Sequence, residues 1–118
     1  MARRKAGPIL AEILAALDGI EKATSGKTLH DYEQDWLLKH GVQRGIEIIS
    51  EAARHLPAEL LVTEPEIPWK QIRGIGNVLR HEYHRIADPI VWAVVTDSLP
   101  TLRKAIERIA TEVAKRES

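Results

Sequence analysis

The sequence predicts an all-α fold, and three features of the chain support this prediction. Apolar residues recur at spacings of three and four along most of its length, which is the period of an amphipathic helix. Turn residues and prolines separate these periodic stretches at residues 24–26, 57–68 and 88–89. The β-branched cluster at 93–96 resembles a strand, but nothing in the chain pairs with it. We therefore expect residues 1–118 to form one domain, a bundle of about four to five helices.

The first expected helix covers residues 9–23 and ends in turn residues at 24–26. Thr28 then stands where it can cap the next helix, with Asp31 as the acidic partner in a capping box. The apolar stripe of the first helix consists of Ile9, Leu10, Ile13, Leu14, Leu17 and Ile20.

The second expected helix, residues 29–56, is the longest, because its apolar pattern continues without a proline until Pro57. A glycine weakens a helix by about 1 kcal/mol relative to alanine, so we expect a bend near Gly41. Three prolines within residues 57–68 predict a loop with a short helical turn. The next helix is expected over residues 69–84.

The last expected helix begins at Asp88-Pro89, since aspartate caps a helix and proline is preformed for its first turn. Pro100 lacks the N–H that would bond four residues back, so it should kink or split this helix. Beyond it, apolar residues again recur at helical spacing, at Leu102, Ile106, Ile109 and Val113.

The composition excludes several classes of protein. The chain has 17 Lys and Arg against 17 Asp and Glu, so a protein that coats nucleic acid by bulk positive charge is not expected. The absence of cysteine removes disulfides, thiolate metal sites and cysteine nucleophiles. No segment resembles a signal peptide, and no run of about 18 uncharged apolar residues could span a membrane. We therefore expect a soluble, cytoplasmic protein.

The segment 72–84 carries the strongest candidate site. On a helix, five of its polar residues share one side, namely Arg73, Asn77, Arg80, His81 and His84. The opposite side is apolar and consists of Ile72, Ile75, Leu79 and Ile86. A neutral imidazole can move a proton near pH 7, and a guanidinium can hold the charge that grows on a phosphate, so this face suits phosphodiester cleavage. A polar face that only meets solvent is the alternative interpretation.

Two glycines, Gly74 and Gly76, lie inside this short helix and weaken it. A chain tolerates such glycines where another element packs close, so we expect a close contact there. A phosphate-binding loop is not indicated, because its third glycine is missing and no strand precedes the pair.

Other residues are weaker candidates. Three pairs could contribute metal ligands, but none has the spacing or the third ligand of a complete site: His30 with Asp31, His40 with Arg44, and Glu51 with His55. We therefore expect no metal and no cofactor. The three tryptophans are expected to fill the core of a chain without phenylalanine, at Trp36, Trp69 and Trp92.

Three segments follow one another in a specific order: Ile67-Pro68-Trp69, Ile72-Arg73-Gly74 and Asn77-Val78-Leu79-Arg80-His81-Glu82-Tyr83. Upstream of these segments, residues 44–53 have the pattern of a long helix. Downstream of them, Val91-Trp92 and Leu99-Pro100 lie in the expected last helices. In these segments the chain closely resembles the HepT-like branch of the HEPN superfamily. The resemblance covers nearly the whole chain.

Proteins of this branch are α-helical homodimers that act as metal-independent endoribonuclease toxins. A neighbouring nucleotidyltransferase antitoxin, called MNT, transfers AMP from ATP onto the tyrosine of a motif in which an arginine precedes His-x-Tyr. By resemblance, His81 is the catalytic histidine, Tyr83 the AMP acceptor and Asn77 the polar residue after the motif's arginine. The arginine itself falls at Gly76 here, and Arg73 and Arg80 are the candidate substitutes.

The resemblance thus implies a ribonuclease toxin that acts on RNA and is neutralised by an MNT antitoxin. With a substituted arginine, cleavage should be slow, and Gly76→Arg should raise its rate. A non-catalytic HEPN domain that binds RNA or a nucleotidyltransferase is the alternative, because the motif's arginine is missing. We further expect a homodimer, because the long helix spreads apolar residues such as Trp36 and Leu37 around more than one face. The hydroxyl of Tyr83 is expected to reach solvent.

Overall fold

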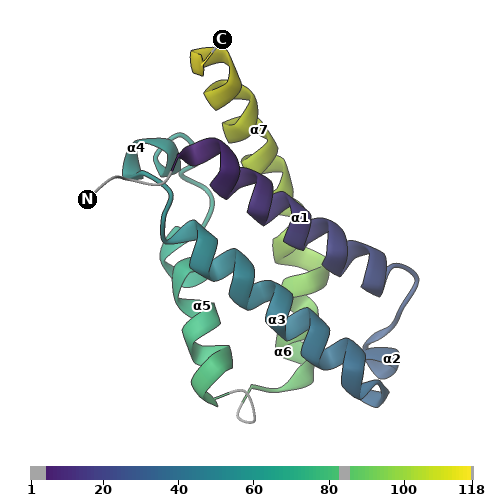
Figure 1. Ribbon diagram of the computed structural model, residues 1–118. Helices are drawn as coiled ribbons and strands as arrows, with labels where there is room; N and C mark the ends of the chain where they lie inside the picture. The colour runs from purple at the N-terminus through teal and green to yellow at the C-terminus, as the bar shows by residue number, and fades with distance from the viewer. Residues whose placement is uncertain (1–4, 83–85, 118) are drawn as a thin grey trace.

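The computed structural model describes residues 5–82 and 86–117, and every regular element in these two ranges is helical. The predicted all-α fold is therefore confirmed. The elements are, in chain order, α1 (Ala6–Thr24), α2 (Leu29–Gln34), α3 (Trp36–Ala53), α4 (Ala58–Leu61), α5 (Trp69–Glu82), α6 (Asp88–Ala93), the π-helical segment η2 (Val94–Ser98) and α7 (Leu99–Glu117) (Figure 1).

The core lies where α1, α3 and α7 meet. Helix α1 packs along α3 and against α7, and α5 packs against α3 (Figure 1). The predicted stripe of α1 is buried except for Leu14, which is partly buried. The apolar residues expected in the last helix are buried as well: Leu102, Ile106, Ile109 and Val113. Helical periodicity therefore identified the core faces of both helices correctly.

The expected long helix 29–56 is wrong in one respect, because it is two helices that meet at Asp35. The backbone of Asp35 is extended, with φ −114° and ψ 99°, and its Oδ1 accepts a hydrogen bond from the N–H of Leu38 at 3.0 Å. Asp35 thus caps α3, and this capping ends α2 at the residue before it. The helix is interrupted at Asp35, whereas α3 continues as one helix through Gly41. The capping box of Thr28 and Asp31 is confirmed, with both of its hydrogen bonds formed.

The expectation that all three tryptophans fill the core is also wrong. Trp36 is 70% exposed, and its ring lies over that of His40 with 4.2 Å between centroids. Trp69 and Trp92 are only partly buried. The aromatic ring at the centre of the core is that of Tyr32, which is fully buried and lies 5.4 Å from the Trp92 ring. Burial raises the pKa of the Tyr32 hydroxyl.

The last part of the chain follows the prediction in outline. Asp88 is the first residue of α6 and not its cap, which is Ala87, and the Asp88 carboxylate accepts a hydrogen bond from Lys39 Nζ at 3.1 Å. Just before Pro100 the helix widens into η2, where the N–H of Leu99 bonds to the carbonyl of Val94, five residues back. Since proline cannot donate, the wide turn absorbs the defect that Pro100 introduces, and the predicted split is confirmed.

The loop before α5 contains the predicted short helical turn, α4, and it fixes the start of α5. The indole Nε1 of Trp69 donates to the carbonyls of Leu61, at 3.0 Å, and Glu64, at 3.1 Å. The carboxylate of Glu64 in turn accepts three hydrogen bonds from Arg108 of α7. None of the described helices combines the length and the apolar character that crossing a lipid bilayer requires.

Candidate active site

Helix α5 divides into a polar and an apolar side, as predicted. Leu79 is buried, and Ile72 and Ile75 pack partly buried against the core. The side chains of the polar face are all exposed in the described part of the helix: Arg73, Asn77, Arg80 and His81. Tyr83 and His84 lie outside the described residues. The exposure of the Tyr83 hydroxyl therefore stays a prediction.

The two interior glycines of α5 have different surroundings. A Cβ atom at position 76 would lie 2.7 Å from the Cβ and Oγ of Ser50 and 3.3 Å from the Cα of Glu47. A Cβ atom at position 74 would meet nothing within 4 Å. The expected close contact is therefore present at Gly76 and absent at Gly74. A side chain at position 76 would enter the interface with α3, so the structure does not support the expected gain of activity from Gly76→Arg.

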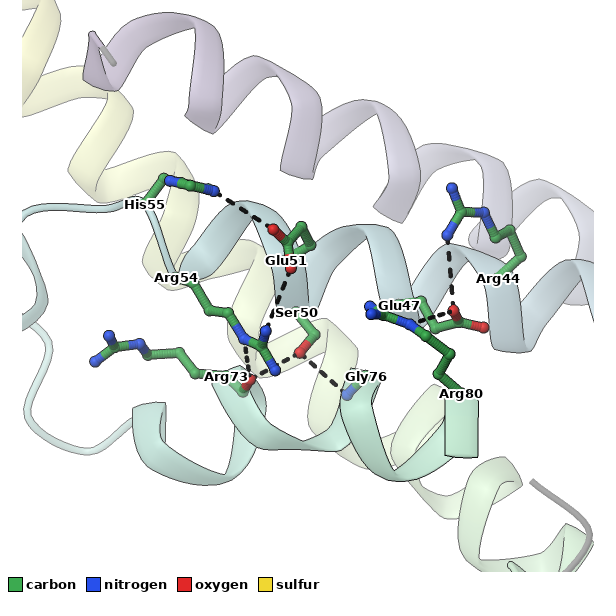
Figure 2. A network of polar contacts seen from close by, with 9 residues as sticks. All are labelled: Arg44, Glu47, Ser50, Glu51, Arg54, His55, Arg73, Gly76 and Arg80. Atoms are coloured by element: carbon green, nitrogen blue, oxygen red, sulfur yellow. Dashed lines mark hydrogen bonds and ion pairs between the residues drawn. The ribbon is translucent and has the colours of Figure 1, made fainter. Parts of the chain in front are cut away.

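Ser50, which is buried in α3, joins the two helices through its hydroxyl group. Its Oγ accepts a hydrogen bond from the N–H of Gly76 at 3.0 Å and donates one to the carbonyl of Arg73 at 3.1 Å. The Nε of Arg54 donates to the same carbonyl at 2.9 Å (Figure 2). Because position 50 pairs with 76 and position 54 with 73, the helices run antiparallel. The first half of α5 is thereby held on α3 by its backbone.

Arg73 and Arg80 therefore stand in different settings. Arg73 joins this network through its carbonyl, while its side chain extends away from Arg80 (Figure 2). Arg80 follows Arg73 by seven positions, which is about 10 Å along a helix axis. Arg80 instead lies in the last turn, beside His81 in sequence, with its Nε 3.7 Å from Glu47 Oε1. Of the two candidate substitutes, Arg80 is the one adjacent to His81.

The pairs considered as metal ligands take part in other contacts. Nε2 of His55 lies 3.5 Å from Glu51 Oε1, and the other oxygen of Glu51 contacts Arg54 at 3.4 Å. Asp31 belongs to the capping box, and the N–H of Thr28 lowers the pKa of its carboxyl group. Among the residues that the structure describes, no three His, Cys, Asp or Glu side chains form a group that could hold a metal ion.

Residues 13–109 match the protein family described as Ribonuclease HepT-like. The chain is 31% identical to Putative RNase TTE0752 of Caldanaerobacter subterraneus subsp. tengcongensis, over 86% of this chain and 91% of that protein. It is 27% identical to Putative RNase MJ1380 of Methanocaldococcus jannaschii, over 91% of this chain and 98% of that protein. It is also 29% identical to Probable ribonuclease HepT of Thermococcus cleftensis, over 85% and 91% respectively. No solved structure gives a significant match.

Proposed function

Because this chain belongs to the HepT-like ribonuclease family, we propose that it cleaves RNA with the imidazole of His81 as its reactive group. The observation that carries the proposal is the exposure of His81 and Arg80 together in the last described turn of α5. An imidazole, a group that can act as a general base, thus stands next to a cation that is able to bind phosphate.

RNA carries its own nucleophile, the ribose 2′-hydroxyl. In the proposed reaction His81 takes the proton of this hydroxyl, whose oxygen then attacks the phosphorus, and the bond to the 5′-oxygen of the next nucleotide breaks. The departing 5′-oxygen takes a proton from water, and the protonated His81 returns its own proton to the solvent. The products are a 2′,3′-cyclic phosphate and a 5′-hydroxyl. The guanidinium of Arg80 stabilises the negative charge that develops on the phosphate oxygens.

The test is cleavage of a labelled single-stranded RNA by the purified protein in the presence of a metal chelator. The same sequence with 2′-O-methyl groups should resist cleavage, because it lacks the nucleophile. His81→Ala should lose about 10²–10⁴-fold in rate. Cleavage of the 2′-O-methyl RNA, or a wild-type rate in His81→Ala, contradicts the proposal.

A non-catalytic domain that binds RNA or a nucleotidyltransferase is the second candidate. The observation in its favour is Gly76, which occupies the position of the family's arginine and has no room for a side chain. Retained RNA binding without cleavage, under all conditions in which a ribonuclease of this family used as a positive control cleaves, would establish this alternative.

We also propose that the protein is the toxin of a cytoplasmic toxin–antitoxin pair and that an MNT-type nucleotidyltransferase adds AMP to Tyr83. The resemblance of residues 77–83 to the family's motif supports this proposal. Incubation with an MNT-type nucleotidyltransferase, ATP and magnesium should add the mass of AMP, which Tyr83→Phe should not acquire. Unchanged mass in the wild type, or added mass in Tyr83→Phe, contradicts it.

A homodimer is proposed as the active form. Trp36 and Leu37, at the start of α3, are 70% and 73% exposed, and such large apolar side chains favour a protein partner. Light scattering should give a mass of twice 13.3 kDa at tens of micromolar. A mass near 13.3 kDa contradicts the dimer.

A further inference from the structure

At the end of α5 that carries His81, two arginines from different helices share one carboxylate. Oε1 of Glu47 in α3 lies 3.6 Å from Nη1 of Arg44 and 3.7 Å from Nε of Arg80 (Figure 2). Arg44 precedes Glu47 by three residues on the same helix, whereas Arg80 reaches across from α5. The two guanidinium groups, called here the Arg44–Arg80 pair, thus bridge the two helices.

The cations of this cluster face solvent, and the anion lies beneath them. The side chain of Glu47 is 17% exposed, against 68% for Arg44 and 47% for Arg80. A carboxylate in this place lowers the repulsion between the two guanidinium groups and holds them near each other. Two positive charges and one negative charge leave a net positive charge on an open surface.

The contacts with Glu47 leave the arginines able to bind a further anion. Both ion-pair distances exceed the 2.7–2.9 Å or so of a charge-assisted hydrogen bond. Each guanidinium has five N–H donors in a planar fork that suits phosphate oxygens. A phosphodiester carries one negative charge, which matches the net charge of the cluster.

We propose that the Arg44–Arg80 pair binds a phosphate of the RNA backbone beside His81, and that Glu47 positions both guanidinium groups. This inference rests on the proposed RNA-cleaving function. Position 76 cannot supply a positive charge, because Gly76 is buried against Ser50. In this proposal Arg44 and Arg80 supply that charge instead. It also brings α3 into a site that the sequence assigned to α5 alone.

The first experiment measures RNA binding without cleavage, in the His81→Ala background. The affinity for a fluorescent single-stranded RNA is determined by anisotropy over a series of KCl concentrations. Arg44→Ala and Arg80→Ala should each weaken binding and reduce the slope of log affinity against log salt by about 0.7, the value for one lost phosphate contact on a single strand. Arg116→Ala is the matched control, because Arg116 is also exposed and pairs with a glutamate, Glu112, on its own helix.

A charge-restoring variant separates phosphate binding from a structural role. In Arg44→Ala the remaining Arg80 is neutralised by Glu47, whereas Arg44→Ala/Glu47→Gln again carries one net positive charge. The double variant should therefore regain the wild-type slope. Glu47→Gln alone should bind RNA more tightly and yet cleave it more slowly at saturating RNA, because the guanidinium groups lose the carboxylate that positions them.

Thermal melting first shows whether each variant is folded. The inference is overturned if the folded Arg44→Ala and Arg80→Ala variants give the same slope of log affinity against log salt as Arg116→Ala. Arg44→Gln serves as the second variant if Arg44→Ala does not fold. If the wild type fails to cleave RNA while these slopes change as expected, the pair is supported and the proposed reaction fails. If cleavage depends on His81 while the Arg44 variants behave like the control, the pair is overturned and the reaction stands.

Discussion

The two halves of α5 differ in how they contact the rest of the protein. The first half is held at three points, through the Trp69 indole, the Arg73 carbonyl and the Gly76 N–H. The last described turn carries Arg80 and His81, both exposed. The first half is thus fixed by hydrogen bonds of its backbone and of the Trp69 indole, whereas the second half packs through Leu79 and leaves the side chains of Arg80 and His81 at the surface. Substitutions in the first half should therefore change stability, and those in the last turn should change activity.

The largest effect on stability is expected at Gly76. Gly76→Ala places a Cβ 2.7 Å from Ser50 and must push α3 and α5 apart, which costs about 1–3 kcal/mol of unfolding free energy. Gly74→Ala is the matched control, because it meets open space and should stabilise the helix by about 0.5–1 kcal/mol. Urea unfolding of both variants measures the difference. Equal changes at the two positions would contradict the close contact at Gly76.

Ser50→Ala should have a smaller effect in the same direction. It removes the hydroxyl that bonds the Gly76 N–H and the Arg73 carbonyl, but Arg54 continues to bond that carbonyl. A loss of about 1 kcal/mol in unfolding free energy is expected from urea titration. Ser98→Ala, an exposed serine on η2, is the control and should change little. An unchanged stability in Ser50→Ala would contradict a stabilising role for the Ser50 hydroxyl.

The smallest effect concerns the loop that holds Trp69. Arg108 hydrogen-bonds to the Glu64 carboxylate and keeps its pKa below the usual value. A lowered pKa in the folded state means that the stabilisation is present above the unfolded-state pKa, near 4.3, and is lost as the pH falls through the folded-state value. Glu64→Gln should therefore be slightly less stable than the wild type at pH 7 and equal to it in acid. A difference that persists in acid would contradict this account.

Much of the fold could be predicted because each helix carries its own signals. The stripe of α1, the capping box at Thr28 and the interruption at Pro100 depend only on neighbouring residues. The apolar pattern does not indicate the break at Asp35, because it continues through this residue. The signal for this break is Asp35 itself, a residue type that favours the N-cap position, directly before Trp36. The size and apolar character of Trp36 predict a core position, but its side chain lies off the buried face of α3.

The site could be predicted only in part, because it is built by two helices. Periodicity gave the exposed face of α5, with Arg80 and His81, correctly. The roles of Ser50, Arg54 and Glu47 depend on which residues of α3 lie opposite α5, and a single sequence does not specify this register. The glycine at position 76 indicates that another element packs close to it. It does not indicate that the neighbour is Ser50.

The claim that the first half of α5 determines stability and its last turn determines activity is tested most directly with His81→Ala. Its RNA cleavage rate is measured together with its unfolding free energy. His30→Ala, another exposed histidine on a helix, is the control. We expect His81→Ala to lose at least about 10²-fold in cleavage rate while its unfolding free energy stays within about 0.5 kcal/mol of the wild type. A wild-type cleavage rate in His81→Ala, or a loss of cleavage that only follows a loss of folded protein, would contradict the account.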